Sequence, residues 1–239
     1  MKKVLLYSGG MDSWLINKIW KPDYRVYVNM HTQYSQTELE RIKLEKDIII
    51  IDFPLAQWER ADAIIPLRNL YLVMVVCNTF PEDDLDICLG ATAGDRVLDK
   101  SLEFADMTSN LLSYLYLPQH WCKGRKVRVN VDFKGMTKTD LLNEYVKLGG
   151  SLEVPLKESF SCYEPIKGRE CWMCKPCFRK YVAFKSCGYQ FDDEIDKKVY
   201  IYIKNEIIPQ IQNGTYGRAS EETEICNIFL ELCNKYDKE

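Results

Sequence analysis

Long apolar runs are missing from this chain of 239 residues. A helix that spans a membrane needs about 20 consecutive apolar residues. The apolar stretch nearest the N-terminus, residues 4–7, ends at Ser8 and is also too short for the centre of a signal peptide. We therefore expect no membrane span and no secretory leader, and we predict a cytoplasmic protein.

A basic excess is missing as well, and histidine is scarce. The 32 lysines and arginines are outnumbered by 35 aspartates and glutamates, which leaves a formal net charge of −3. Proteins whose main partner is a nucleic acid carry clustered cations that neutralise phosphates, so we expect no direct contact with nucleic acid. His31 and His120 are the only histidines, and His31, which follows a predicted strand, is either a site residue or a plain loop residue.

Cysteine, by contrast, is abundant, with ten residues in the chain. Without a secretory leader these cysteines are not expected to form a disulfide framework. Four of them have the spacing C-x8-C-x2-C-x2-C, and four thiolates spaced in this way can surround one tetrahedral ion with no open position. We predict a structural Zn²⁺ site whose ligands are Cys162, Cys171, Cys174 and Cys177. A redox-active pair or an iron–sulfur cluster is the alternative for these residues.

Segments typical of strands and helices alternate through the first two-thirds of the chain. Short apolar or alternating runs predict five strands, at residues 4–7, 25–30, 47–53, 86–89 and 126–132. Runs with helical spacing predict helices at residues 12–20, 36–46, 66–79, 102–116 and 137–148, the third with proline at its first position. We therefore predict an α/β fold with a Rossmann-like, five-stranded parallel sheet and helices on both faces.

The alternation ends near residue 150, which predicts three parts of the chain. They are an ATP-binding α/β domain over residues 1–150, a zinc-binding segment over residues 151–188 and a helical extension over residues 189–239. Two helices are expected in the extension, at residues 195–212 and 221–236. Their apolar residues recur at helical spacing, which indicates packing against the main domain or a second subunit.

A phosphate-binding loop is predicted directly after the first strand. Its residues, in chain order, are Ser8, Gly9, Gly10, Met11, Asp12 and Ser13. Two glycines allow a tight turn close to an anion, and the helix that follows offers N–H groups and a partial positive charge. Asp12 would cap this helix or bind Mg²⁺ through water. A plain turn with a capping aspartate is the alternative to a nucleotide site.

The loop is not a Walker A loop, because no Gly-Lys-Ser/Thr follows its glycines. It resembles the PP-loop of enzymes that split ATP into AMP and pyrophosphate. Together, the loop and the cysteine cluster resemble the 7-cyano-7-deazaguanine synthase (QueC) family. Further segments that resemble the motifs of this family are Tyr34-Ser35-Gln36, Ile64 to Asn69, Gly90 to Asp95, Met136-Thr137-Lys138, Ser161-Cys162-Tyr163 and, after the cysteines, Arg179.

The resemblance runs from Lys2 to about Gly188 and implies a reaction. In it, 7-carboxy-7-deazaguanine is converted to the nitrile with ATP and ammonia, through an adenylated carboxylate and an amide, by a homodimer. The implied catalytic residues are Asp12, Ser13, Arg68 and Lys138, and the implied substrate contacts are Tyr34, Gln36, Asn69 and Asp95. Simpler alternatives are a surface ion pair for Arg68 and a solvated helix start for Lys138.

Two stretches depart from the pattern of the family. Arg96-Val97-Leu98-Asp99-Lys100 stands where the family has Tyr-Pro-Asp-Cys-Arg, and Gln36 is not followed by Arg-His. Both stretches bear on the substrate, so one alternative is a variant that stops at 7-amido-7-deazaguanine or acts on another carboxylate. A tRNA-thiolating PP-loop enzyme and a non-catalytic nucleotide-binding protein are two further alternatives.

Overall fold

The chain folds as two compact units in a computed structural model that describes residues 1–61 and 64–237. The first unit is Met1–Gly135 and the second is Met136–Glu239. The three-part division expected from the sequence stays a prediction; the units themselves divide before the helix at Lys138–Lys147 because this helix packs against Lys175–Ser186. In the described part of the chain, no helix has both the length and the apolarity that a membrane crossing requires.

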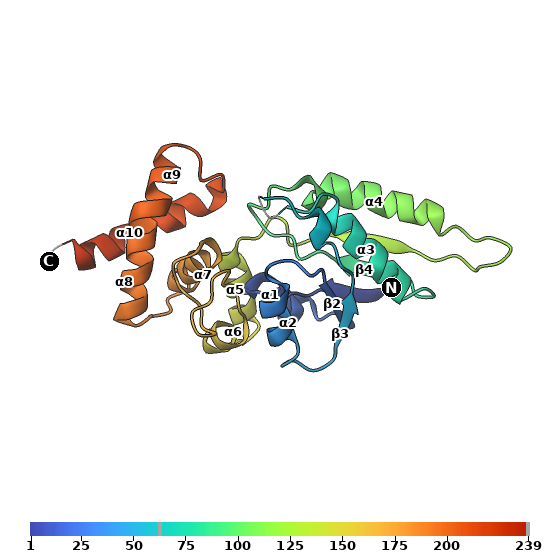
Figure 1. The fold of residues 1–239 in the computed structure, drawn as a ribbon, viewed down its shortest axis with the longest axis horizontal. Helices are drawn as coiled ribbons and strands as arrows, with labels where there is room; N and C mark the ends of the chain where they lie inside the picture. Colours follow the sequence, from blue (N-terminus) through green and yellow to red (C-terminus); the bar gives the residue numbers. More distant parts are fainter. Residues whose placement is uncertain (62–63, 238–239) are drawn as a thin grey trace. The chain divides into compact units, whose positions relative to one another are not determined.

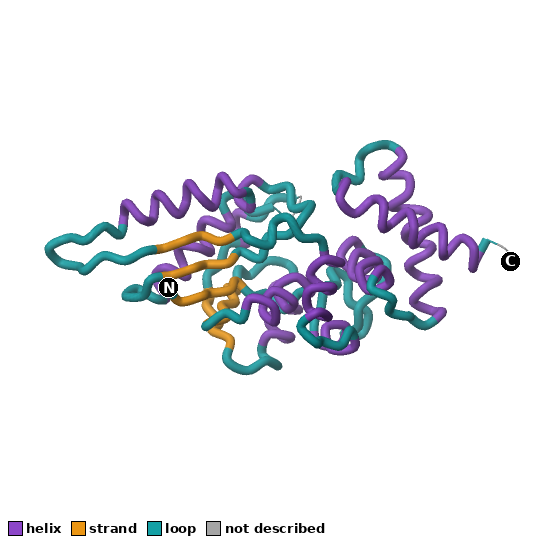
Figure 2. The backbone as a smooth tube through the Cα atoms, turned by 180° about the vertical axis from the view of Figure 1, so that it is seen from behind, coloured by secondary structure: helices purple, strands orange, loops and turns teal. Residues whose placement is uncertain are grey.

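A single parallel sheet forms the centre of the first unit. Its strands are β1 (Lys2–Leu6), β2 (Tyr24–Asn29), β3 (Ile48–Asp52), β4 (Leu85–Cys88) and β5 (Val127–Asn130). They lie side by side in one sheet (Figure 2). Their order is β3-β2-β1-β4-β5, and every neighbouring pair is parallel. The predicted fold class, a five-stranded parallel α/β sheet, is confirmed.

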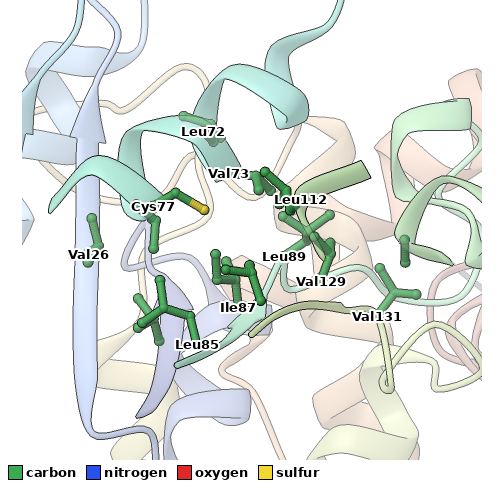
Figure 3. Packing of buried hydrophobic residues seen from close by; sticks show 14 of the residues in the cluster. Val26, Leu72, Val73, Cys77, Leu85, Ile87, Leu89, Leu112, Val129 and Val131 are labelled. Carbon is green, nitrogen blue, oxygen red and sulfur yellow. The ribbon is translucent and has the colours of Figure 1, made fainter. Parts of the chain in front are cut away.

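Helices cover both faces of this sheet. Helices α3 (Arg68–Thr79) and α4 (Leu102–Leu115) share a core with strand residues such as Val26 and Ile87 (Figure 3). Strand β1 contributes Val4 to the same core. Successive side chains of a strand point to opposite faces, so Leu5 of β1 faces away from this core. Leu5 is fully buried, as is Leu15 of α1 (Met11–Trp20), which contacts β1. A further helix, α2 (Ser35–Ile42), contacts β2.

The start of α3 differs from the prediction. The helix begins at Arg68, and Pro66 is not its first residue. Leu67 lies between them with a φ of 59°, in the left-handed region, and a residue in that conformation cannot continue a right-handed helix. The expected role of Pro66 as a helix start was therefore wrong. Two short 3-10 turns, Ala56–Trp58 and Leu98–Lys100, complete the unit.

The second unit is helical. It contains α5 (Lys138–Lys147), α6 (Glu153–Glu158), α7 (Lys175–Ser186), α8 (Asp193–Tyr202), a π-helical turn (Ile203–Ile207), α9 (Ile208–Gln212) and α10 (Ala219–Tyr236) (Figure 1). The C-terminal extension packs on α7, because Phe178 and Tyr181 share one core with residues such as Val199 of α8 and Ile225 of α10. The extension was expected to pack against the main domain or a second subunit, but its core is shared with α7, which belongs to the predicted zinc-binding segment.

The sheet offers a direct test of core packing. Ile87 on β4 is fully buried, whereas Ile50 on β3 is 44% exposed. We expect Ile87→Ala to lower the free energy of unfolding by about 2–5 kcal/mol, because it removes buried methyl groups and leaves a cavity. Ile50→Ala is the matched control and should change stability by less than about 1 kcal/mol. Urea unfolding followed by circular dichroism measures both, and equal losses would contradict this packing.

Candidate functional site

The predicted phosphate loop has the backbone that an anion site needs. It joins β1, which ends at Leu6, to α1, which begins at Met11. Gly9 has a φ of +71°, a conformation that strains any residue with a Cβ atom. Gly10 is the N-cap of α1 and, as a glycine, has no side chain that could cap this helix. The first N–H groups of α1 are therefore suited to bind an anion.

Hydroxyl groups close the loop on itself. The Ser8 amide donates to Ser13 Oγ at 3.3 Å, and Ser13 Oγ donates to the Gly10 carbonyl oxygen at 3.0 Å. Asp12 lies in the first turn of α1, where a negative side chain is stabilised by the helix dipole. The interpretation of Asp12 as the N-cap was wrong, since Gly10 occupies that position. Its role as a Mg²⁺ ligand stays a prediction.

Asn69, a predicted substrate residue, carries an unsatisfied donor. Its side chain is 3% exposed, and its amide Nδ2 has no hydrogen-bond partner among the described residues. Its backbone N–H donates to Asp99 Oδ2 at 3.1 Å. A buried donor without an acceptor costs about 1–3 kcal/mol, and such a group in a native structure is explained by a water molecule or a ligand. Asn69 is therefore a strong candidate for ligand contact.

Asp95, a second predicted substrate residue, accepts hydrogen bonds from its own chain. Its Oδ2 accepts from Lys100 Nζ at 3.0 Å and from the Thr92 amide at 3.2 Å. Lys100 and Asp99 both belong to the stretch that departs from the pattern of the family. This stretch therefore contacts both Asn69 and Asp95. Its side chains influence how these two residues can form hydrogen bonds with a ligand.

The two predicted substrate contacts at the start of α2, Tyr34 and Gln36, differ in their exposure to solvent. Gln36 is exposed and donates to Glu40 at 2.8 Å, on the outer side of the helix, whereas Tyr34 is half-buried just before the helix starts. Glu38 faces inward, and the Tyr27 hydroxyl donates to its Oε2 at 3.2 Å. Burial raises the pKa of Glu38 to about 7, although the Tyr27 hydrogen bond and the charge of Arg68 oppose the rise.

Glu38 is a residue that sequence reasoning missed. The signal for it was present, since Ser35, Glu38 and Ile42 lie at helical spacing on the buried side of α2. Arg68, the first residue of α3, is half-buried and lies close enough to Glu38 to oppose the rise of its pKa. The pair places a cation and a carboxyl group that titrates near neutral pH on one side of the first unit.

His31 lies at the carboxyl end of β2, beside the end of β3. Its φ is 59°, and its Nε2 lies 2.6 Å from Asp52 Oδ1, which also accepts from Asn29 Nδ2 at 2.8 Å. The hydrogen bond with His31 is the main reason why the pKa of Asp52 is lowered. Both side chains are about half exposed, so His31 forms an ordered surface pair on the edge where ligands of such sheets bind.

The four predicted metal ligands come together in the second unit. The Sγ atoms of Cys162, Cys171, Cys174 and Cys177 all lie within 4.8 Å of one another, and all four residues are buried. Zinc–sulfur bonds of about 2.3 Å in a tetrahedron place sulfur atoms about 3.8 Å apart, and the sulfurs of Cys171 and Cys177 are separated by 4.0 Å. The arrangement of the cluster is suited to a single metal ion.

Backbone amides donate hydrogen bonds to two of these sulfurs. The Cys171 amide donates to Cys162 Sγ, and the Met173 amide donates to Cys171 Sγ, both at 3.3 Å. The Cys177 thiol donates to Cys174 and lowers the pKa of Cys174, whereas burial raises the pKa of Cys171 and the same hydrogen bond raises the pKa of Cys177. Hydrogen bonds to the charged form of a group favour that form, and a metal binds the thiolate.

A buried lysine positions the cysteine segment. Lys180 is fully buried, and its Nζ donates to the carbonyl oxygens of Leu156 and Ser159 and to Glu170 Oε2, at 3.2, 2.8 and 3.0 Å. Glu170 also accepts from the Ser161 amide at 2.7 Å. Lys180 lies three residues after Cys177 on α7 and Glu170 directly precedes Cys171. Sequence reasoning missed both residues, because their partners are distant and no local pattern marks them.

Lys138, a predicted catalytic residue, is less exposed to solvent than a solvated helix start would be. It is 8% exposed at the start of α5, so the interpretation as a solvated helix start was wrong. Thr137 and Asp140 form a capping box around this start. A cavity of about 10 Å³ lies beside it and is lined by Thr137, Lys138, Thr139, Arg179, Val182, Ala183, Glu221, Glu224 and Ile225. A cavity of this size holds about one water molecule.

Comparison with known proteins gives one consistent family. The family described as "Queuosine biosynthesis protein QueC" matches residues 50–188. The 7-cyano-7-deazaguanine synthase of Sulfolobus acidocaldarius is 29% identical over 127 residues, which are 52% of this chain and 25% of the relative. That of Anaeromyxobacter sp. is 35% identical over 66 residues, which are 28% of this chain and 27% of the relative.

A third relative is matched over most of its length. The 7-cyano-7-deazaguanine synthase of Sulfurihydrogenibium sp. is 26% identical over 216 residues, which cover 76% of this chain and 93% of the relative. The chain therefore spans about a quarter of the length of the first two relatives and nearly all of the third. Among solved structures, U34-tRNA thiolase NcsA from Methanococcus maripaludis with its [4Fe-4S] cluster has a TM-score of 0.37 and 15% identity, covering 85% of this chain and 71% of that chain.

The partly buried carboxyl group of Glu38 makes stability depend on pH. Its pKa is about 7 in the folded chain and near 4.5 as an ordinary glutamate, so between these values the folded state holds a proton that the unfolded state has released. Folding stability should therefore fall as pH rises through this window and level off above pH 7. We expect the fall to be about 1–3 kcal/mol.

Glu38→Gln should remove this contribution, because the amide does not titrate. Unfolding free energies of wild type and variant at pH 5 and pH 7.5 provide the measurement. Glu40→Gln, an exposed neighbour on α2, is the control and should keep the wild-type pH dependence. An unchanged pH dependence in Glu38→Gln would show that Glu38 ionises normally.

Proposed function

The chain belongs to the QueC family, and from this membership and the geometry of the loop we propose that it is an ATP-dependent enzyme that converts 7-carboxy-7-deazaguanine and ammonia to 7-cyano-7-deazaguanine. The single observation that carries the ATP dependence is the Gly9–Gly10 turn between β1 and the start of α1, with Gly9 in the left-handed region. A helix start of this kind binds phosphate groups through backbone N–H donors.

The proposed reaction has three stages. A carboxylate oxygen of the substrate attacks the α-phosphorus of ATP, so that a carbon–oxygen–phosphorus linkage forms and pyrophosphate leaves. Ammonia then attacks the carboxyl carbon, AMP leaves with the bonding electrons of the broken carbon–oxygen bond, and the nitrogen loses a proton to give the amide. The amide oxygen then attacks the α-phosphorus of a second ATP and pyrophosphate leaves. Breaking of the carbon–oxygen bond releases AMP, and loss of the two remaining nitrogen protons gives the nitrile.

The side chains of the protein supply positioning and charge in this proposal. The loop Ser8–Ser13 holds the phosphates, and Arg68 and Lys138 offset their charge. Asp12 would hold Mg²⁺ through water, and this ion would neutralise phosphate charge. The reaction requires no nucleophilic side chain, since the substrate carboxylate and ammonia are the nucleophiles.

Among the proposed substrate contacts, Asn69 has the best support, because its buried amide lacks an acceptor in the described part of the chain. Asp95, Tyr34 and Gln36 complete the set, although Gln36 is exposed. The ion pair between Lys100 and Asp95 favours an alternative to nitrile formation. An enzyme with this altered contact would stop at 7-amido-7-deazaguanine or act on another carboxylate. Product analysis by mass spectrometry, with the carboxylated deazaguanine, ATP and ammonia, separates these outcomes.

We propose further that the metal at the cysteine cluster is Zn²⁺ and that the enzyme works as a cytoplasmic homodimer. Four buried thiolates fill a tetrahedral zinc shell and leave no position for substrate. The ion would therefore be structural and would hold together a segment with little regular structure.

Asp12→Ala tests the role of the loop. We expect AMP formation to fall at least 100-fold, on the order of the loss seen when an electrostatic group is removed from an active site, while the circular dichroism spectrum is unchanged. Wild type should release AMP and pyrophosphate, which ion-exchange chromatography of the nucleotides measures. Asp23→Ala, which changes an aspartate outside the loop, is the control. ADP as the main product of wild type would refute the proposed chemistry.

Cys174→Ser tests the metal site. Structural zinc contributes about 10–16 kcal/mol at neutral pH, whereas whole domains have only about 5–15 kcal/mol of net stability. The variant should therefore lose zinc and melt at a markedly lower temperature. Cys226→Ser, on α10 outside the cluster, should retain both properties. Elemental analysis should find about one zinc per wild-type chain, and iron with sulfide in its place would favour a cluster of another type.

A further inference from the structure

The outer side of α4 exposes a row of large apolar side chains. Four of them leave more than half of their surface in contact with water: Met107 (66%), Leu111 (51%), Tyr114 (71%) and Leu115 (59%). Residues three and four positions apart lie on one side of a helix, so these four form a single strip, the α4 stripe. Ala105 and Leu112, on the other side of the helix, are buried in the core of the first unit. Adjacent apolar side chains on a surface mark a site of interaction.

A hairpin between α4 and β5 extends beyond the end of the helix (Figure 1). Its backbone is held by the Arg125 N–H, which donates to the Tyr116 carbonyl oxygen at 3.1 Å, and by two hydrogen bonds between Gln119 and Cys122. The Arg125 guanidinium also lies over the Tyr116 ring, 3.9 Å from its centroid. Trp121, at the turn, is 71% exposed. The hairpin is therefore an ordered projection that presents a further apolar side chain.

The two ends of this surface carry opposite charges. Glu103 and Asp106 are the only charged residues of α4, and both are exposed in its first half. Glu103 lies one turn before Met107, at the start of the α4 stripe. Lys123, which is also exposed, lies in the hairpin at the other end. A second copy of the surface that runs in the reverse direction would pair each acidic end with a basic end.

Leu111 lies near the middle of this surface. It follows Glu103 by eight residues, which is about 12 Å along a helix. In the other direction Lys123 adjoins Pro118, seven residues after Leu111, because the next residue, Gly124, lies directly against Pro118. A Cβ atom at Gly124 would come within 2.7 Å of the Pro118 nitrogen, so this close contact requires glycine. An order of acid, apolar centre and base is self-complementary about a two-fold axis.

We propose that the α4 stripe binds the same stripe of a second copy of this chain, with the two helices antiparallel about a two-fold axis at Leu111. In this arrangement Met107 packs against the partner's Leu115, and Glu103 faces the partner's Lys123. Rows of side chains four residues apart pack into one another, as is common between helices in contact. The inference rests on the homodimer of the proposed function and assigns the surface through which its two copies meet.

The exposed apolar area is large enough for a stable dimer. An aromatic side chain buries about 150–250 Å², and Tyr114 and Trp121 are each 71% exposed. With the other three side chains of the α4 stripe, the apolar surface is on the order of 600 Å² per copy. Stable interfaces bury about 800 Å² per partner and have a polar rim, which Glu103 and Lys123 supply here.

Leu111→Glu places two carboxylates against each other at the two-fold axis. We expect the dissociation constant of the dimer to rise at least 100-fold, because like charges opposed in an interface are strongly unfavourable. Glutamate is a good helix former and Leu111 is half exposed, so the fold and the circular dichroism spectrum should be kept. Leu230→Glu, at a 61% exposed leucine of α10 outside the stripe, is the control and should dimerise as wild type does. Analytical ultracentrifugation measures both.

Charge reversal tests the antiparallel direction. Glu103→Lys and Lys123→Glu each oppose like charges at both ends of the dimer, and each should raise the dissociation constant about tenfold. In an equimolar mixture, the new lysine of one variant faces the new glutamate of the other, and the remaining native pair is also complementary. The mixture should therefore dimerise with the wild-type dissociation constant. A folding defect in either variant cannot be corrected by mixing, so recovery reports the contact itself.

Three outcomes separate the interface from the proposed reaction. A dimer that survives Leu111→Glu, or single variants that mixing does not recover, would overturn the α4 stripe as the interface. A monomeric wild type would overturn the homodimer and the stripe together. AMP formation by wild type is measured alongside, and a wild-type dimer that forms no AMP would refute the reaction while the variants still decide the interface.

Discussion

The parallel direction of all five strands is the constraint on which the first unit depends. Parallel strands need a crossover after each strand, so every strand-to-helix loop leaves at the same edge of the sheet. The turn through Gly9 follows β1, His31 follows β2, and Thr92 to Asp95 follow β4. Residues far apart in the chain therefore meet at one edge, where ligands of such sheets bind. Buried strands such as β1 and β4 supply the rigid support for these loops.

The second unit depends on two buried cations of α7 that are paired with carboxylates. An unpaired ammonium in a protein interior costs several kcal/mol, yet Lys180 is completely buried because two carbonyl oxygens and Glu170 accept from it. These contacts hold the cysteine segment against α7. Arg179, the neighbour of Lys180 on α7, makes a second buried ion pair with Glu221. One helix thus anchors the metal ligands on one side and the extension on the other.

Features that arise from local sequence could be predicted. The strands, the glycine turn and the cysteine spacing depend on residues close in the chain, and the parallel sheet and the sulfur cluster confirm them. Contacts between distant residues could not be predicted. Glu38 with Tyr27 and Lys180 with Glu170 join residues 11 and 10 positions apart, and Arg179 with Glu221 joins residues 42 apart. Local rules also failed at Pro66 and Asp12, since the left-handed Leu67 and the N-cap Gly10 moved the two helix starts.

Helix α7 contributes both to the cysteine cluster and to the core of the extension, and this affects folding during synthesis. Cys177 is followed at once by Phe178, whose ring packs in the core completed by α8 and α10. The ribosome produces about 5–20 residues per second, so the last turn of α10, at Tyr236, appears about 3–12 s after Cys177. During that interval the thiols are complete while the core over α7 still lacks α10. Metal uptake during synthesis would order this helix early and give the arriving extension a formed surface on which to dock.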